Sequence, residues 1–182
     1  LPIFDGQINS LDIVYLGNSN PHINGGFGFN LQYGDWSLRS NFNYRQGIKI
    51  VNSAKMGLEE MFNAYNQSSA VNWRWRKNGD QTIIPRAMFD TAYNFLGSDR
   101  YVEDASFVRM SYIQLVYNFK KKMLKPLGLR RLQVSLSGQN LLCWSKYSGT
   151  DPEHSPGSWG IAYDNSQTPR SKSVTMNLQV GF

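Results

Sequence analysis

The stretch Val174-Thr175-Met176-Asn177-Leu178-Gln179-Val180-Gly181-Phe182 (VTMNLQVGF) alternates strictly between apolar residues and small or polar residues. Successive side chains of a β-strand point to opposite faces, so this period of two puts all the apolar residues on one face. The stretch therefore predicts a strand with one face toward an apolar medium and the other toward water.

Four further segments show the same period. They are His22–Tyr33, Trp36 to about Gly47, Phe107–Phe119 and Arg131–Leu142. The first two are joined by Gly34-Asp35, a tight turn, and predict a β-hairpin. In the third segment the expected apolar face is Ile113, Leu115, Tyr117 and Phe119, with Val116 as an exception on the opposite face.

The connections between these segments alternate between short and long. Residues 34–35 and 120–130 are short, whereas residues 48–106 and 143–171 are long. In an up-and-down meander this order places the short turns at one end of the strands and the long loops at the other, as in outer-membrane barrels. A strand of eleven residues rises about 36 Å, and a tilt of about 40° leaves a height of about 27 Å, close to the apolar band of such barrels.

These patterns predict an all-β fold, an antiparallel up-and-down transmembrane β-barrel. Five strands are too few to close a barrel, which needs about eight, so the chain is expected to be part of a larger protein. The rival interpretation is a soluble or surface-attached all-β glycan-binding module, a lectin-like sandwich with aromatic packing inside.

Composition excludes several other classes. The chain has 182 residues, 14% of them aromatic, and no run of about 18 apolar residues that a transmembrane helix needs. The net charge is +6, but six of the 19 basic residues lie between Lys120 and Arg131 without interleaved aromatic residues, so no nucleic-acid binding is expected. The single cysteine, Cys143, allows no internal disulfide and no zinc site by itself. The chain does not open with a positively charged start, an apolar stretch and a small-residue cleavage site. Leu1 is therefore not expected to be the start of a secretory precursor, and the chain is expected to be mature or a piece.

Several short motifs then narrow the interpretation. In chain order they are Gly17–Pro21 (GNSNP), Gly25–Phe27 (GGF), Tyr44–Gly47 (YRQG), Ser98–Arg109 (SDRYVEDASFVR), Val134–Leu142 (VSLSGQNLL), Lys146–Glu153 (KYSGTDPE) and Gln167–Arg170 (QTPR). In order and spacing this set resembles the SusC/RagA-type TonB-dependent outer-membrane transporters of Bacteroidetes. The last motif departs from the family pattern, because the family's tyrosine is missing.

The resemblance implies a 22-stranded barrel with a plug domain and TonB-contacting regions upstream, of which this chain supplies about the last five strands. It implies the outer membrane as location, a SusD-like surface lipoprotein as partner, and import of oligosaccharides or peptides without bond chemistry, so no enzyme and no cofactor. Residues 1–21, 48–106 and 143–171 are then extracellular loops, 22–47 and 107–142 are hairpins, and 172–182 is the terminal strand. Phe182 is the expected assembly signal.

Candidate sites are few. The cluster Trp73-Arg74-Trp75-Arg76-Lys77 combines aromatic and cationic side chains and predicts contacts with substrate or with the lipoprotein lid through Trp73, Arg74, Trp75 and Arg76. Asp5–Asn9 and Asp12 resemble part of a calcium loop, but its first ligand positions lack oxygen side chains, so a turn and no metal site is expected. Glu103 and Asp104 are expected to form ion pairs with Arg100 and Arg109, and no catalytic residue is predicted.

Overall fold

The computed structural model describes residues 12–62, 64–88, 99–154 and 160–182. The chain divides into two compact units. The sheet unit comprises Pro21–Gly47, Ala105–Glu153 and Thr168–Phe182, and the connection unit comprises Leu1–Asn20, Ile48–Asp104 and His154–Gln167. Each unit is described by itself.

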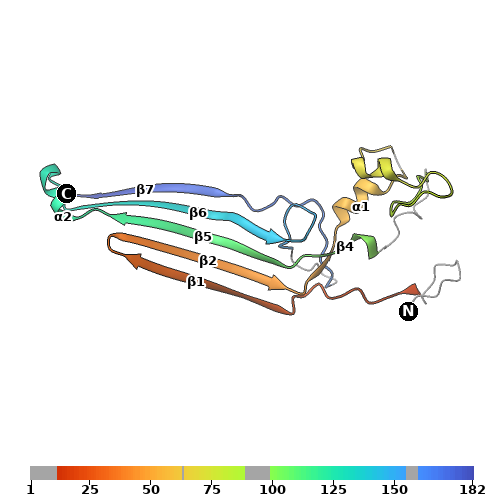
Figure 1. Ribbon diagram of the computed structural model, residues 1–182, viewed down its shortest axis with the longest axis horizontal. Coiled ribbons are helices and arrows are strands. Elements are labelled where there is room, and N and C mark those ends of the chain that lie inside the picture. Colours follow the sequence, from red (N-terminus) through yellow and green to blue (C-terminus); the bar gives the residue numbers. More distant parts are fainter. Residues whose placement is uncertain (1–11, 63, 89–98, 155–159) are drawn as a thin grey trace. The chain divides into compact units, whose positions relative to one another are not determined.

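The sheet unit is one five-stranded antiparallel sheet (Figure 1). Its strands are β1 (Ile23–Tyr33), β2 (Trp36–Gln46), β5 (Phe107–Asn118), β6 (Arg131–Ser145) and β7 (Ser173–Gly181). They lie in the order β1-β2-β5-β6-β7, so each strand pairs with the next strand of the meander. The five strands predicted from the alternation are confirmed, and β6 runs three residues beyond its predicted end.

The register aligns the apolar residues of all five strands on one face. Near the β1 edge, Phe27 is opposite Phe42 with ring centroids 4.9 Å apart. Near the β7 edge, on the same face, Leu136 is opposite Met176. The apolar face comprises Phe27, Phe29, Leu31, Tyr33, Trp36, Leu38, Phe42, Tyr44, Val108, Met110, Ile113, Leu115, Tyr117, Leu132, Val134, Leu136, Leu142, Trp144, Val174, Met176, Leu178 and Val180. Ser40 interrupts it, and its hydroxyl donates a hydrogen bond to the Tyr112 carbonyl (3.1 Å). The face is thus continuous from one edge strand to the other.

A β-bulge at Ser111 changes which residues of β5 lie on this face. Asn41 pairs with Tyr112, but Phe42 pairs with Met110, so Ser111 is an extra residue on β5. Its hydroxyl donates to the Asn43 side-chain oxygen. Beyond the bulge, Val108 and Met110 replace odd-numbered residues on the apolar face. Alternation alone predicted only the odd-numbered half, because a bulge shifts the period by one residue.

Most side chains of this apolar face are exposed or half-buried, and Met110 is buried. Met176 is 69% exposed and Val174 is 65% exposed, and every residue of β1 is exposed. The opposite face consists mainly of glycine, serine, threonine and amide residues, and its charged residues on the strands are Arg39, Arg45, Arg109 and Arg131. The sheet therefore has one apolar and one polar face. In the described residues of this unit, no second sheet packs against the apolar face.

Both short connections lie at the same end of the sheet (Figure 1). The Gly34 turn has a φ of 58°, which glycine adopts without strain. The second connection is a helical turn formed by α2 (Lys121–Leu124) and η5 (Lys125–Leu127), ended by Gly128 in the left-handed region. No helix in the described part of the chain is long and apolar enough to cross a membrane.

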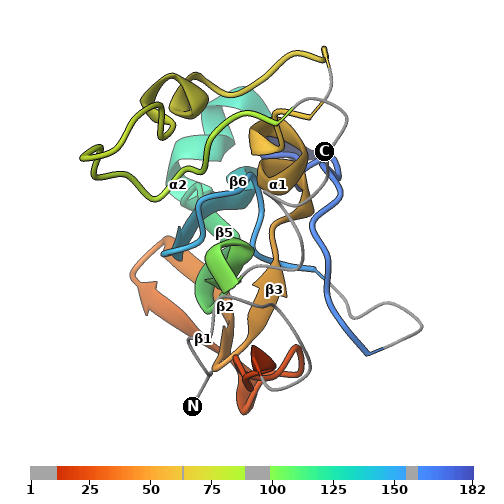
Figure 2. The same ribbon diagram turned by 90° about the vertical axis from the view of Figure 1, so that its right-hand side faces the viewer.

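The long connection 48–106 has its own structure, which the sequence analysis treated only as a loop. It contains β3 (Lys49–Val51), α1 (Ser53–Glu59), η2 (Ser69–Trp73), η4 (Asp99–Tyr101) and β4 (Val102–Asp104). β3 leads into α1 (Figure 2). β3 pairs antiparallel with β4, and the Asn52 side chain caps α1 by accepting from the Lys55 N–H (2.9 Å). A small apolar cluster of Met61, Val71 and Ile84 follows α1.

Candidate functional site

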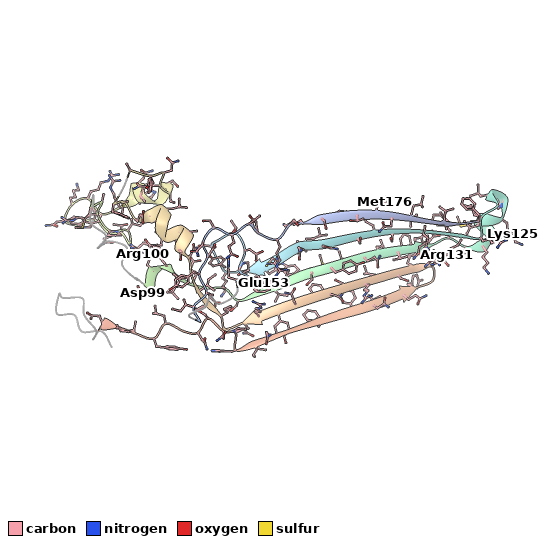
Figure 3. All side chains as sticks on the ribbon, turned by 180° about the vertical axis from the view of Figure 1, so that it is seen from behind. Asp99, Arg100, Lys125, Arg131, Glu153 and Met176 are labelled. Atoms are coloured by element: carbon pink, nitrogen blue, oxygen red, sulfur yellow. The ribbon has the colours of Figure 1, made fainter. Side chains whose placement is uncertain are left out.

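Five charged side chains meet on the polar face of the sheet unit. They are Arg45 of β2, Arg109 of β5, Asp151 and Glu153 from the connection after β6, and Arg170 before β7. We call this group the Arg109 clasp. It joins four segments that are far apart in the sequence and lies at the end of the sheet from which the long connections leave (Figure 3).

Arg109 is the centre of the clasp. Its guanidinium Nη2 donates a hydrogen bond to Asp151 Oδ1, and its Nε lies 3.3 Å from Glu153 Oε2, an ion pair without hydrogen-bond geometry. The Arg109 side chain is 6% exposed, and both carboxylate side chains are 10% exposed. Charges this far from water are stable only when they are paired, so the pairing decides whether the segment Asp151–Glu153 stays on the sheet.

The other two arginines hold the outer side of the clasp. Arg170 Nη2 lies 2.9 Å from Glu153 Oε1, and Arg45 Nη2 lies 3.8 Å from the same oxygen. The Arg170 side chain is 55% exposed and the Arg45 side chain 31% exposed, so solvent screens both pairs. The clasp thus has a buried inner pair and a solvated rim.

Local sequence explains why both carboxylates face the sheet. Pro152 favours an extended conformation for the residue before it, and residues two apart in an extended segment share a side. Asp151 also organises the backbone around itself, because its carboxylate accepts N–H groups from Glu153 (2.9 Å) and Arg170 (3.2 Å). The Asp-Pro-Glu sequence therefore presents two carboxylates to one arginine.

The same contacts set the acidity of Asp151. Burial alone would raise the pKa of this carboxyl, but the two backbone N–H groups and the Arg109 guanidinium outweigh burial and hold the pKa below its ordinary value. Asp151 is therefore charged throughout the neutral range.

A pH dependence follows from this lowered pKa. A carboxyl whose folded pKa lies below its unfolded value, about 3.9, stabilises the fold above that value and loses this contribution as the pH falls through the folded pKa. We expect the thermal stability advantage of the complete wild-type protein over an Asp151→Asn variant to be largest at neutral pH and to shrink as the pH is lowered toward 3. Thermal unfolding in detergent at several pH values measures this. A constant difference at all pH values would contradict the role of the Asp151 charge.

Serine hydroxyls join the strand ends beside the clasp. The Gly47 N–H donates to Ser106 Oγ (3.0 Å), Ser145 Oγ donates to the Ser106 carbonyl (2.9 Å), and the Tyr147 N–H donates to Ser145 Oγ (3.1 Å). Tyr147 is buried, and a side chain at Gly149 would collide with its ring. Glycine at 149 therefore lets the chain pass over Tyr147 toward the clasp.

The predicted contact residues lie in the connection unit, where Trp73 ends η2 and Arg74, Trp75 and Arg76 follow it. Trp73 is 80% exposed and Arg76 is exposed, whereas Arg74 and Trp75 are half-buried. Arg74 Nη1 donates to the Val71 carbonyl (3.2 Å) and Arg76 Nη2 to the Asn72 carbonyl (2.8 Å). The two guanidinium groups thus support their own loop, and Trp73 is the aromatic side chain of the cluster that projects into solvent.

The remaining sequence predictions have mixed outcomes. Arg109 was expected to pair with Glu103 or Asp104, which is wrong, because its partners are Asp151 and Glu153. Glu103 Oε1 instead lies 3.4 Å from Lys55 Nζ. Phe182 follows β7 and is 84% exposed. The turn at Asp5–Asn9 lies outside the described residues. Within residues 12–62, 64–88, 99–154 and 160–182, no group of three or more His, Cys, Asp and Glu side chains is placed to hold a metal.

Comparison with known proteins identifies the relatives of this chain. No protein-family profile matches it. It is 29% identical to TonB-dependent receptor P26 of Formosa agariphila over 98% of its own length and 19% of that protein. It is 27% identical to TonB-dependent receptor P3 of the same organism, over 98% of the chain and 18% of that protein. The chain is thus similar in sequence to TonB-dependent receptors of a Bacteroidetes. The resemblance predicted from the motifs is confirmed.

Solved structures agree on the fold. The chain superimposes on the structure of the RagAB peptide transporter with a TM-score of 0.78 and 24% identity, covering 97% of this chain and 19% of that one. A second RagAB structure, in the closed-closed state, gives a TM-score of 0.76 and 23% identity, covering 100% and 20%. The mainly antiparallel sheet is thus the fold of these receptors. The chain spans about a fifth of the length of the curated TonB-dependent receptors that it matches.

The clasp takes its residues from four of the motifs on which the family resemblance rests. Arg45 lies in Tyr44–Gly47, Arg109 ends Ser98–Arg109, Asp151 and Glu153 lie in Lys146–Glu153, and Arg170 ends Gln167–Arg170. Sequence reasoning missed the clasp, although each motif contributes a charge and the signs are complementary. Which arginine meets which carboxylate depends on strand register, which the motifs do not contain.

Proposed function

We propose that the chain is part of a TonB-dependent transporter of the outer membrane that imports oligosaccharides or peptides together with a SusD-like lipoprotein. The observation that carries the proposal is the continuous apolar face, most of it exposed or half-buried, opposite a polar face. In lipid, backbone N–H and C=O groups must be paired within the protein, and a closed sheet pairs them all. Such a barrel has an apolar outer face toward lipid and a polar inner face toward the lumen. A sandwich would instead bury such a face against a second sheet.

Closure requires strands from the rest of the complete protein. In the described residues, β1 pairs only with β2, and β7 only with β6, so both edges have unpaired backbone groups. Exposed edges are unfavourable in lipid and promote aggregation. We propose that these are about the last five strands of a 22-stranded barrel whose other strands pair with β1 and β7, and that Phe182 belongs to the assembly signal of the last strand.

The two ends of the strands then face different compartments. Barrels of this kind have short periplasmic turns and long extracellular loops. Residues 34–35 and 120–130 are accordingly periplasmic, and residues 1–21, 48–106 and 143–171 are extracellular. The polar face lines the lumen, where the Arg109 clasp holds Asp151–Glu153 against the wall at the extracellular mouth and shapes the passage without any bond chemistry. The plug and the TonB-contacting regions lie upstream.

The experiment on function uses the complete protein in its own cells. Deletion of its gene is expected to abolish uptake of one class of labelled oligosaccharide or peptide, and a TonB-deficient strain should show the same loss. The complete protein is expected in the outer-membrane fraction and soluble only with detergent. If the complete protein is instead recovered folded in buffer without detergent, the proposal is wrong.

Trp73 provides a test of the partner contact. Replacing Trp73 with alanine is expected to weaken binding of the lipoprotein roughly thirtyfold, because exposed tryptophans at interfaces often carry a large share of the binding energy. The fold should survive, since Trp73 holds its loop through its backbone carbonyl, which accepts from Thr82 Oγ1 (2.7 Å). Affinity measurements with the lipoprotein and with labelled substrate check this.

A matched control is Tyr65→Ala, which removes another exposed aromatic side chain of the connection unit (78% exposed). Loss of substrate affinity alone in Trp73→Ala would assign the cluster Trp73, Arg74, Trp75 and Arg76 to substrate. Unchanged affinities for both would contradict the proposed contact.

A further inference from the structure

The short-turn end of the sheet is strongly cationic. Residues 31–38, 117–133 and 178–182 make up this end, and their side chains include six cations and one carboxylate. The cations are Lys120, Lys121, Lys122, Lys125, Arg130 and Arg131, and the carboxylate is Asp35. Lys125 and Arg131 lie at this end in Figure 3, and Glu153 of the clasp lies at the other.

Internal pairing neutralises only a small part of this charge. Asp35 Oδ2 lies 3.3 Å from Lys120 Nζ, and Arg131 donates to the neutral Gln133 side chain (3.0 Å). Lys121, Lys122 and Lys125 are exposed on the helical turn of α2 and η5. Three ammonium groups within five residues repel one another in water, so an anionic partner would stabilise the turn.

The same turn presents apolar side chains outward. Leu124 is 1% exposed and anchors the turn, whereas Met123 is 53% exposed and Leu127 66% exposed. The Gly128 N–H donates to the Lys125 carbonyl (3.2 Å), and Gly128 ends the turn in the left-handed region directly after Leu127. Cations beside exposed apolar groups are typical of segments that lie in a membrane interface.

Aromatic side chains fix the depth of this end in a bilayer. Trp36 and Tyr117 have ring centroids 4.5 Å apart, and Tyr117 and Phe119 have centroids 4.8 Å apart. Tyr33 pairs with Trp36 across the hairpin and is 88% exposed. Trp and Tyr concentrate at the level of lipid head groups, so the cluster places the head groups next to residues 120–131.

We propose that the turn Lys120–Arg131 is a binding surface for anionic phospholipid head groups in the leaflet on the short-turn side. Lys121, Lys122 and Lys125 bind the phosphates, and Met123 and Leu127 reach the acyl region below them. The proposal rests on the proposed function, because it needs a barrel in a bilayer. A nucleic acid or an acidic protein would account for the cations but leaves the exposed apolar side chains and the aromatic cluster without a role.

The experiment compares lipids bound to the complete protein. The protein is placed in nanodiscs of equimolar phosphatidylcholine and phosphatidylglycerol, released, and analysed by native mass spectrometry for retained lipid. The wild type is expected to retain phosphatidylglycerol in preference to phosphatidylcholine. In the triple variant Lys121→Gln/Lys122→Gln/Lys125→Gln this preference should fall at least about tenfold, since each cation near an anionic surface contributes substantially to lipid binding. The preference should also fall with salt.

The control removes three exposed lysines that lie outside the turn, with Lys77→Gln/Lys146→Gln/Lys172→Gln. This variant should keep the preference. If the wild type shows no preference for phosphatidylglycerol, or if both triple variants lose it equally, the lipid site is wrong. Neither result would contradict the proposed barrel. Retention abolished by added nucleic acid or by an acidic protein would overturn it in favour of that partner. Failure of the wild type to enter nanodiscs would overturn the proposed function and this inference together.

Discussion

Replacing Met176 with arginine is expected to destabilise the complete protein in a bilayer by about 2–4 kcal/mol, the cost of a cation on the lipid-facing side near the midplane of a barrel. Met176 lies in the middle of β7, opposite Leu136 on the apolar face, and is 69% exposed (Figure 3). Because Met176 is exposed, the substitution creates no cavity. The loss of stability therefore measures whether the side chain faces lipid or water. Urea unfolding in lipid vesicles and the amount of folded protein in the outer membrane measure the effect.

The adjacent residue is a matched control. Asn177 lies on the polar face opposite Ser135, so Asn177→Arg is expected to change the free energy of unfolding by well under 1 kcal/mol. Similar losses from the two substitutions, or a larger loss from Asn177→Arg, would show that the apolar face does not contact lipid. The pair differs by one position in the strand, so differences in strand propensity contribute little.

The sheet was predictable because its information is local. Period-two alternation in His22–Tyr33 and Val174–Phe182 fixes which residues share a face, and Gly34-Asp35 fixes the turn. The bulge at Ser111 was not predictable, since serine is compatible with a regular strand and the bulge is visible only in the register with β2. The structure of residues 48–106 was also missed. Its α1 is a single short helix, and its β3 and β4 pair across about fifty residues.

The Arg109 clasp was also not predictable from local sequence, because its charge pairs depend on strand order. Its residues are visible in the sequence as Arg45, Arg109, Asp151, Glu153 and Arg170, and the Asp-Pro-Glu spacing already places two carboxylates on one side. The partners of Arg109 and Arg45 are set by strand order, which brings together residues that are 42 and 108 positions apart in the sequence. Nearest neighbours in sequence, Glu103 and Asp104, were therefore the wrong choice for Arg109.

Replacing Arg109 with alanine is expected to lower the stability of the complete protein by about 3–5 kcal/mol, because Asp151 and Glu153 would stay buried without their central cation. The released segment should then become accessible, so trypsin is expected to cleave after Lys146 or Arg170 faster than in the wild type. Thermal unfolding and timed proteolysis with mass mapping of the fragments measure the two effects.

Two variants separate the buried charge from general damage. Arg170→Ala removes a rim arginine that is 55% exposed, and it is expected to cost no more than about 1 kcal/mol. In the double variant Arg109→Ala/Asp151→Ala the loss should be smaller than the sum of the single losses, since one unpaired charge is removed with its partner. Additive losses would mean that the two residues act independently, and equal costs for Arg109→Ala and Arg170→Ala would mean that burial does not set the strength of the clasp. If the expected order holds, the charges in Tyr44–Gly47, Ser98–Arg109 and Lys146–Glu153 serve to hold the segment Asp151–Glu153 against the polar face of the sheet.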